Sequence, residues 1–248
     1  MKDLGGELVV GRRAVRELLA ARRRRVRDVW MADTVDDREI EDLAEEARAP
    51  VRRVNRGRLD AEARADAPQG VLAHAQALPC ADLATLSRAR RPFLLVLDGV
   101  TDPHNLGALL RTAEVGGATG AVLPRHRAAH VTPTVTKAAA GAIEYLDMAV
   151  VPGIPAALSD LRANGVWTVG LDPDGDRPVY DLDLATEPVA LVVGAEGAGL
   201  SRLAKARCDV LVAVPQYGRL ASLNVSTAAA VAVFEIARRR AGDGARAR

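Results

Sequence analysis

Four short polar side chains near the C-terminus lie between two strongly apolar stretches. They are Ser222, Asn224, Ser226 and Thr227. The surrounding sequence, VPQYGRLASLNVSTAAAVAVFE from Val214 to Glu235, begins at the end of a strand-like run and continues into an alanine- and valine-rich segment typical of a buried helix. Backbone N–H groups at such a junction lack partners within the helix, so Asn224 or Ser226 is expected to cap it. The same side chains could hydrogen-bond a ligand.

A second polar stretch, DGVTDPHNLGALLRTAEVGGATG from Asp98 to Gly120, also follows an apolar run. Pro103 is expected to block a helix, and Asn105 to cap the helix that follows. Arg111 would then lie near the end of the second helical turn, among leucine, alanine and valine. A guanidinium partly buried among such neighbours needs an anion. The chemistry indicated by this stretch is therefore the binding of negative charge.

A third stretch, GAEGAGL from Gly194 to Leu200, comes directly after another apolar run. Its glycines allow a backbone to approach a ligand closely, and Glu196 places an acid at the end of the predicted strand. A dinucleotide site is disfavoured because the G-x-G-x-x-G order is absent and no long helix clearly follows. This loop is a candidate ligand site of another kind.

Metal chemistry and carboxylate acid–base chemistry have less support. His126 and His130 are four residues apart, but they lie in a Pro- and Arg-rich loop without a third ligand, so no metal site is predicted. Turns account for Asp98 and Asp102 without a catalytic pair.

The three stretches must be positioned by the elements before them. Those elements are apolar runs rich in Val and Leu, at Phe93–Leu97, Gly120–Leu123, Leu146–Val151, Val166–Leu171, Val189–Val193 and Val210–Val214. Such runs suit strands buried on both faces of a mainly parallel sheet, in which ligands bind beyond the carboxyl ends of the strands. Residues 5–78 instead read as a small α/β unit, with strands at 26–31, 51–55 and 70–75. A polar, basic hinge ending at Pro92 separates the two parts.

Composition narrows the class of protein. The 248 residues are 49% hydrophobic, which suffices for a packed core. No apolar run is long enough to span a membrane and no secretory signal is evident, so a cytoplasmic location is expected. Cys80 and Cys208 lie far apart without a metal-binding pattern, and both are expected to be ordinary thiols.

Basic residues (34) nearly balance acidic ones (32), so any contact with nucleic acid must come from local patches. Arginines cluster at Arg22–Arg25, at Arg88, Arg90 and Arg91, and at Arg238–Arg240. Two interpretations stay open for them. They either contact RNA phosphates, or they are solvated faces and favourable charges at helix C-termini.

The three stretches, in this order and at this spacing, closely resemble the three signature motifs of the SpoU (TrmH-like) RNA 2′-O-methyltransferases. VVGRRAVRELL and PQGVLAHAQ in the N-terminal part resemble the substrate-binding domain of the family's bacterial enzymes that methylate a guanosine of 23S rRNA. The resemblance covers nearly the whole chain.

The resemblance implies an α/β fold with two domains. An L30e-like RNA substrate-binding domain would occupy residues 1–78, a linker residues 79–91, a methyltransferase domain tied in a trefoil knot residues 92–242, and a disordered tail residues 243–248. It further implies S-adenosylmethionine as methyl donor and a homodimer. The implied activity is ribose 2′-O-methylation of a guanosine in 23S rRNA, with a tRNA guanosine, another rRNA site or a non-catalytic RNA-binding protein as alternatives.

Carried over position by position, the resemblance assigns two groups of residues. The cofactor would be held around Gly194, Val214 and Leu223, with Gly197 and Leu200 close by. The catalytic and substrate-binding positions would be Asn105, Arg111, Glu196, Ser222 and Asn224.

Roles within the second group follow from chemistry. In the family, Arg111 would deprotonate the ribose hydroxyl, but a guanidinium pKa above about 12 favours stabilisation of the developing oxyanion instead. Glu196 would steady Asn105 or Arg111, and Asn224 would cap the last helix while shaping the cofactor loop. The chain departs from the family at Pro68, where histidine is common, and at Gln216, Tyr217 and Arg219, where smaller or more apolar residues are common.

Overall fold

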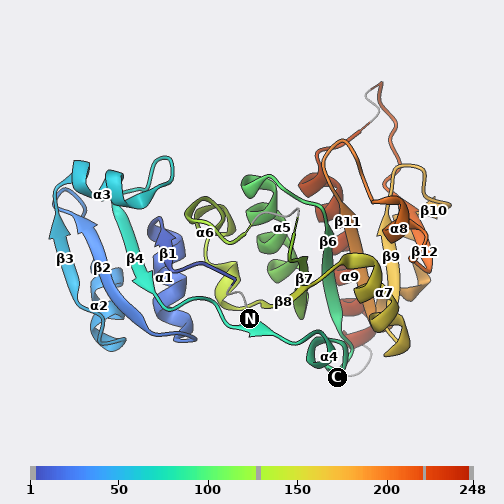
Figure 1. Ribbon diagram of the computed structural model, residues 1–248, viewed down its shortest axis with the longest axis horizontal. Helices are drawn as coiled ribbons and strands as arrows, with labels where there is room; N and C mark the ends of the chain where they lie inside the picture. The colour runs from blue at the N-terminus through green and yellow to red at the C-terminus, as the bar shows by residue number, and fades with distance from the viewer. Residues whose placement is uncertain (1–3, 127–129, 220–221, 246–248) are drawn as a thin grey trace.

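A computed structural model describes residues 4–126, 130–219 and 222–245 of the chain. The polypeptide forms a four-stranded sheet followed by an eight-stranded sheet (Figure 1). The strands are β1 (Leu8–Val10), β2 (Val26–Ala32), β3 (Val51–Val54), β4 (Val71–Ala75), β5 (Cys80–Ala81), β6 (Phe93–Asp98), β7 (Gly120–Pro124), β8 (Asp147–Val151), β9 (Trp167–Leu171), β10 (Arg177–Pro178), β11 (Val189–Gly194) and β12 (Val210–Ala213).

Helices connect most of these strands. They are α1 (Arg12–Ala21), α2 (Arg38–Glu46), α3 (Arg56–Ala63), α4 (Leu83–Ser87), α5 (Pro103–Val115), α6 (Pro133–Ala139), α7 (Ile154–Ala163), α8 (Arg202–Lys205) and α9 (Val225–Ala245), with 3-10 turns η1 (Ala142–Glu144), η2 (Val179–Asp181) and η3 (Asp183–Thr186). None of the helices in the described ranges is both long and apolar enough to cross a bilayer.

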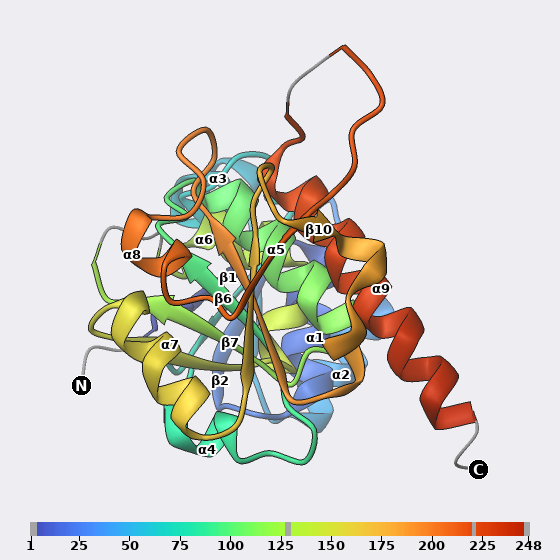
Figure 2. The ribbon, with the colours of Figure 1, turned by 90° about the vertical axis from the view of Figure 1, so that its right-hand side faces the viewer.

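The large sheet is parallel throughout, in the order β10-β12-β9-β11-β6-β7-β8-β5. Along β6 the side chains of Phe93, Leu95 and Leu97 enter one apolar cluster, and those of Leu94 and Val96 enter another. Helices α5 and α9 cover the first face, and α4, α7 and α8 cover the second (Figure 2). Apolar residues on both faces therefore give a sheet with two cores, as the continuous runs predict.

The chain crosses itself at one edge of this sheet. Strand β12 lies between β9 and β10, although the chain reaches β10 first. The segment from β9 to β10 runs against β12, since a Cβ on Gly175 would lie 2.4 Å from the carbonyl carbon of Val212. The C-terminal part then continues to α9, which packs on α5 and η3. This threading is the kind of crossing that a trefoil knot requires and that general topology rules disfavour.

The predicted strands are confirmed, and the structure adds elements that the sequence patterns did not predict. All six apolar runs form strands, whereas the short strands β1, β5 and β10 were not anticipated. The expected linker is structured, because β5 pairs with β8 and α4 packs on α7. Residues 243–245, expected in a disordered tail, continue α9, and residues 246–248 lie outside the described ranges.

Pro103 begins α5 instead of blocking it. Proline suits the first helical position because its missing N–H would have no partner there. The cap is Asp102, whose Oδ1 accepts a hydrogen bond from the Asn105 backbone N–H at 2.7 Å. The prediction that Asn105 caps this helix is therefore wrong, and its side chain is available for other contacts.

Two arginine clusters have intramolecular roles. Arg240 at the end of α9 donates to the backbone carbonyl oxygens of Ala185 (2.8 Å), Arg91 (2.9 Å), Pro92 (3.1 Å) and Glu187 (2.6 Å). Its guanidinium lies over the Phe93 ring, and burial lowers its pKa to about 10. Arg23 and Arg24 bond to residues of the second half of the chain. These side chains join parts of the protein to one another.

Glu235 on α9 forms hydrogen bonds with the other two arginines of the Arg238–Arg240 cluster. Its carboxylate accepts from Arg238 Nε and Arg239 Nε, each at 2.7 Å. These bonds, that from Arg238 foremost, lower its pKa from 4.5 to about 2.

A lowered carboxylate pKa gives stability that is present above the unfolded-state pKa and lost as the pH falls through the folded-state value. We therefore expect Glu235→Gln to be less stable than the wild type near neutral pH, with the difference shrinking as the pH falls below about 4.5. Urea unfolding of both proteins between about pH 6 and pH 3 measures this. A difference independent of pH would contradict the assignment.

Cys208 is a free, partly buried thiol. Its Sγ donates to the Ala204 carbonyl oxygen at 3.3 Å, and burial is the largest cause that raises its pKa to about 12. A thiol with so high a pKa is a poor nucleophile at neutral pH. Cys80 is also free.

Candidate active site

The loop after β11 is a tight hairpin that closes on itself. Ala195 and Gly199 exchange two backbone hydrogen bonds, at 3.0 and 2.8 Å. Gly197 at its tip has φ of +75°, and a Cβ on Gly194 would lie 2.1 Å from the carbonyl carbon of Gly199. The glycines therefore serve the closure of the loop itself. The consequence for the site is that Glu196 is held at the tip of a compact turn.

Glu196 forms a three-residue cluster with two asparagines from elsewhere in the chain. Asn105 Nδ2 donates to Glu196 Oε2 at 2.7 Å, and Asn224 Nδ2 lies 3.3 Å from Glu196 Oε1. Asn224 Nδ2 also lies 3.1 Å from Asn105 Oδ1. Each of the three predicted stretches thus contributes one member, as the proposed convergence requires. Glu196 steadies Asn105, one of the two partners expected for it.

Asn224 has a second task at the start of α9. Its Oδ1 accepts hydrogen bonds from the Ser226 backbone N–H at 2.9 Å and from the Ser226 hydroxyl at 2.6 Å. The Asn224 carbonyl oxygen also accepts the first bond of the helix, from the Ala228 N–H at 2.9 Å. The expected helix cap is therefore present in the structure, and the same side chain contacts Asn105 and Glu196.

These two roles are separable. Asn224→Ala should cost about 1 kcal/mol of stability through loss of the cap and should also lower activity. Asn224→Asp keeps an acceptor for the Ser226 N–H but removes the amide donor and places a carboxylate beside Glu196. We expect it to lose activity like the alanine variant while losing less stability from the cap. Thermal unfolding and a methylation assay on both variants measure this, and activity retained in Asn224→Ala would confine Asn224 to capping.

A cavity of about 370 Å³ lies beyond the carboxyl ends of β9, β11 and β12. This volume is within the range of small-molecule sites. Its lining includes seven of the residues predicted from sequence, namely Gly194, Glu196, Gly197, Val214, Ser222, Leu223 and Asn224. Asn105 borders it through Glu196 and Asn224.

Besides Asn105, two other predicted residues are absent from the lining of this cavity. Leu200 is buried with Ala190 and Val192 in the core on the α7 side of the sheet, where it anchors the end of the loop that follows β11. Arg111 is exposed, and it makes no hydrogen bond or ion pair with the described part of the chain. The expectation of a partly buried Arg111 is wrong because it is five positions along α5 from the buried Leu106, which turns it about 140° away from that residue around the helix.

The residues around the cavity also include contributors that sequence reasoning missed. Asp172 follows β9, is 7% exposed, and accepts from Lys205 Nζ and from the Asp174 N–H, both at 3.0 Å. Asp98 Oδ2 accepts from the Ser201 N–H at 2.7 Å, which anchors the far end of the glycine loop. An acid directly after an apolar run marks both positions, and turns had been taken to explain Asp98.

The described residues contain no group of three His, Cys, Asp or Glu side chains able to hold a metal ion. His126 and His130 are both exposed, on either side of residues 127–129, which are outside the described ranges.

A parallel sheet with a loop-lined cavity at its carboxyl edge defines a ligand-binding α/β protein. The sequence model of the SpoU rRNA Methylase family matches residues 92–234, and a model described as RNA 2′-O ribose methyltransferase substrate binding matches residues 8–79. The chain belongs to the SpoU rRNA methylase family.

Relatives agree over nearly the full length. The chain is 39% identical to the 23S rRNA (guanosine-2′-O-)-methyltransferase RlmB of Pseudomonas putida, over 94% of this chain and 97% of that one. It is 40% identical to the protein of the same name from Haemophilus influenzae, over 96% and 99%. The solved structure of the SpoU methyltransferase AviRb from Streptomyces viridochromogenes with AdoMet superposes with a TM-score of 0.79, at 28% identity over 95% of this chain and 90% of that one.

Proposed function

We propose that this protein transfers a methyl group from S-adenosylmethionine to the ribose 2′-hydroxyl of a guanosine in 23S rRNA. The observation that carries the proposal is the cluster of Asn105, Glu196 and Asn224 at the mouth of the cavity, in a chain of this family. The names of the relatives supply the rRNA substrate and its guanosine.

The cavity fits the methyl donor chemically. Leu171, Val193 and Val214 provide apolar wall, and the acidic residues Asp172 and Glu196 are also among the residues that line the cavity. A ligand that joins a positive sulfur to an adenosine suits such a mixed lining, because the carboxylates favour the cation and the apolar wall favours the base. When bound, S-adenosylmethionine supplies an electrophilic methyl group. Gly194, Gly197, Val214, Leu223 and, from below, Leu200 would hold it.

The residues around the mouth would position the ribose. A ribose hydroxyl is a very weak acid, so positioning and stabilisation of developing negative charge have to supply much of the rate. Glu196 is already the acceptor for two amide donors, which fixes the orientation of Asn105 and Asn224. Ser222 lines the same cavity. Arg111 would contribute the charge that stabilises the oxyanion.

We propose that Arg111 acts on the cavity of a second copy of the chain, related to the first by a twofold axis. Exposed apolar side chains lie on α5 and α9, which run side by side (Figure 2): Val115 is 61% exposed and Phe234 is 49% exposed. Arg111 is one helical turn from Val115, on the same open side of α5. A second copy of the chain covering this face would bury the apolar residues and bring its own cavity toward Arg111, so we propose a homodimer with shared sites.

Mixing subunits tests the shared site. Arg111→Ala and Glu196→Ala homodimers should each be inactive. If Arg111 acts on the partner's cavity, a mixed dimer of the two has one site with both residues intact. We expect random exchange to restore about a quarter of wild-type activity, because half of the dimers are mixed and half of their sites are complete. Mixtures that stay inactive although heterodimers form would show that Arg111 acts within its own chain.

The two parts of the chain would have different roles. Residues 1–78 would bind the RNA, residues 79–91 would connect, and residues 92–242 would bind the methyl donor and carry out the transfer. Incubation with labelled S-adenosylmethionine and total RNA, followed by mapping of the methylated ribose, tests the function. We expect label on a guanosine of large-subunit rRNA. Label in tRNA alone would overturn the substrate, and no label in any RNA would favour a binding protein without catalysis.

A further inference from the structure

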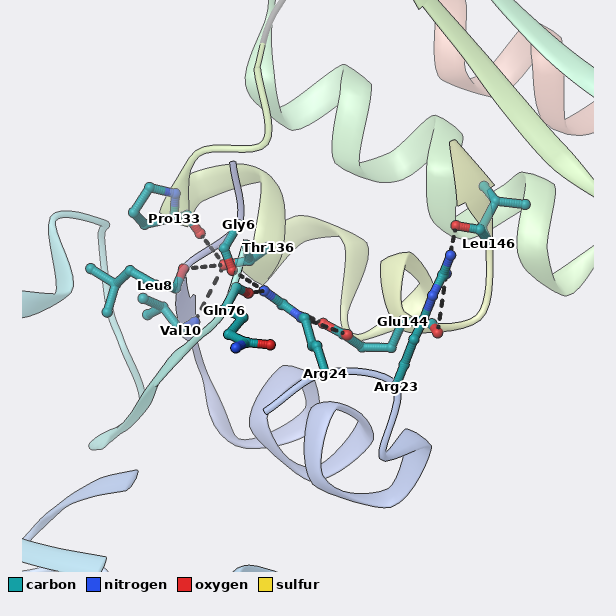
Figure 3. A network of polar contacts seen from close by, with 10 residues as sticks. All are labelled: Gly6, Leu8, Val10, Arg23, Arg24, Gln76, Pro133, Thr136, Glu144 and Leu146. Carbon is teal, nitrogen blue, oxygen red and sulfur yellow. Dashed lines mark hydrogen bonds and ion pairs between the residues drawn. The ribbon is translucent and has the colours of Figure 1, made fainter. Parts of the chain in front are cut away.

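A buried ion pair joins the small sheet to the large one. Arg24, between α1 and β2, donates from Nε to Glu144 Oε2 at 3.0 Å and from Nη2 to Glu144 Oε1 at 2.7 Å (Figure 3). The side chains are 2% and 1% exposed. Glu144 belongs to η1, which follows α6 in the second half of the chain. The fork of the guanidinium therefore meets the carboxylate in bidentate geometry, away from solvent.

Arg24 also holds both connections of the small sheet. Its Nη1 donates to the carbonyl oxygen of Gly6 at 2.7 Å, before β1, and to that of Gln76 at 2.5 Å, after β4 (Figure 3). Arg23 beside it donates to the Leu146 carbonyl oxygen at 3.1 Å. A pivot of the small sheet about its connection to the large one would break these bonds together.

The contact leads to the helix that carries Asn105 and Arg111. The buried Thr136 hydroxyl on α6 accepts from the Val10 N–H of β1 at 3.3 Å. Helix α6 crosses α5 closely, since a Cβ on Gly107 would lie 2.4 Å from that of Ala138. Gly107 is two residues from Asn105. The small sheet is thus seated on α6, and through it on the support of the candidate active site.

The buried ion pair between the two sheets fixes their relative orientation more than it stabilises the fold. Desolvation of the two charges offsets most of their attraction, so an apolar pair of similar volume often gives equal stability. Two apolar side chains can shift against each other at little cost. The guanidinium of Arg24, in contrast, must meet the Glu144 carboxylate and two carbonyl oxygens at once, which is possible in one geometry only.

We infer that Arg24 and Glu144 are positioning residues, which fix the orientation of the small sheet over α5 and so decide which ribose of a bound RNA reaches the cavity. This inference rests on the proposed function. The pair fixes the distance between the RNA bound by the small sheet and the methyl donor bound by the large one. It touches neither.

The test replaces the pair by apolar residues of similar volume, in the full-length double variant Arg24→Met with Glu144→Leu. We expect the dissociation constant for S-adenosylmethionine to stay within about twofold, because the cavity is formed elsewhere. Amide exchange at Gly6 and Val10, whose N–H groups bond Val131 and Thr136 across the junction, should accelerate more than tenfold. With rRNA, KM should rise about tenfold or more, and methyl groups should spread to neighbouring riboses.

The matched control is Arg22→Met with Glu46→Leu, an exposed ion pair within the small unit, two residues from Arg24. It should behave as the wild type in all assays. Glu144→Gln, which keeps the shape of the side chain, should shift site choice in the same direction if the double variant does not fold.

Three results would overturn the inference. These are unchanged amide exchange in the double variant, unchanged site choice and KM despite faster exchange, and loss of S-adenosylmethionine binding, which would make the pair a support of the cavity. A wild type that methylates no RNA would refute the proposed function itself. Methylation by the wild type with the same site choice in the double variant would refute this inference alone.

Discussion

Arg111→Ala is expected to lower the rate of ribose methylation by about 10³-fold while leaving the affinity for S-adenosylmethionine within about twofold of wild type. Loss of one group that stabilises an oxyanion typically costs 10²- to 10³-fold in rate, and here a full charge is removed. The side chain is exposed and makes no hydrogen bond or ion pair within the described residues, so its loss should change stability by less than about 0.5 kcal/mol. Single-turnover methylation and calorimetric titration with the cofactor separate the two effects.

Arg111→Lys is the informative control for this variant. Lysine keeps the charge but lacks the planar fork of donors, so we expect a rate about 10- to 100-fold below wild type. Nearly full turnover by the lysine variant would show that the fork is dispensable. Loss of cofactor binding in either variant would instead assign Arg111 a structural role.

Gly194→Ala is expected to abolish binding of S-adenosylmethionine and to destabilise the protein by about 3 kcal/mol or more. The new Cβ would lie 2.1 Å from the carbonyl carbon of Gly199 and 2.3 Å from the Leu200 nitrogen. Because these neighbours are backbone atoms of the same hairpin, no flexible side chain can move aside and the hairpin has to open. Opening would break the two bonds between Ala195 and Gly199 and displace Glu196 from its asparagine partners.

Thermal unfolding and cofactor titration measure this prediction. Gly153→Ala at the start of α7 is the matched control, since a Cβ there has no neighbour within 4 Å and φ is −165°. It should bind the cofactor as the wild type does. A Gly194→Ala protein that folds and binds the cofactor normally would contradict the argument that this glycine closes the loop.

Sequence reasoning succeeded where burial follows from composition alone. Runs of Val and Leu bounded by turns are strands because few other elements bury every side chain, and the loops at their carboxyl ends converge because the strands are parallel. This brought Glu196 and Asn224 to one cavity, and Asn105 to its border.

The orientation of Arg111 was missed for a physical reason. Apolar neighbours in sequence say little about a helical residue, whose burial depends on its angle around the axis. The residues Leu106, Leu109, Leu110 and Ala113 of α5 are buried. Arg111 lies between them in the sequence but on the opposite, exposed side of the helix. The crossing at Gly175 could not be predicted from local patterns, because it depends on how segments distant along the chain are ordered in the sheet, and only the family resemblance implied it.

The position of β12 beneath the segment from β9 to β10 has a consequence for how the protein matures. Residues 172–176 leave the ribosome before β12 does, so β12 takes its place between β9 and β10 only after both of those strands have been synthesised. Pairing of β12 with both strands joins segments that are distant along the chain, and loop closure of this kind costs entropy before the contacts form, so we expect it to be a slow step of folding. The contacts of Arg240 with the Arg91 and Pro92 carbonyl oxygens ahead of β6 can form only after α9 has been synthesised, so they fix the C-terminal helix in place late in folding.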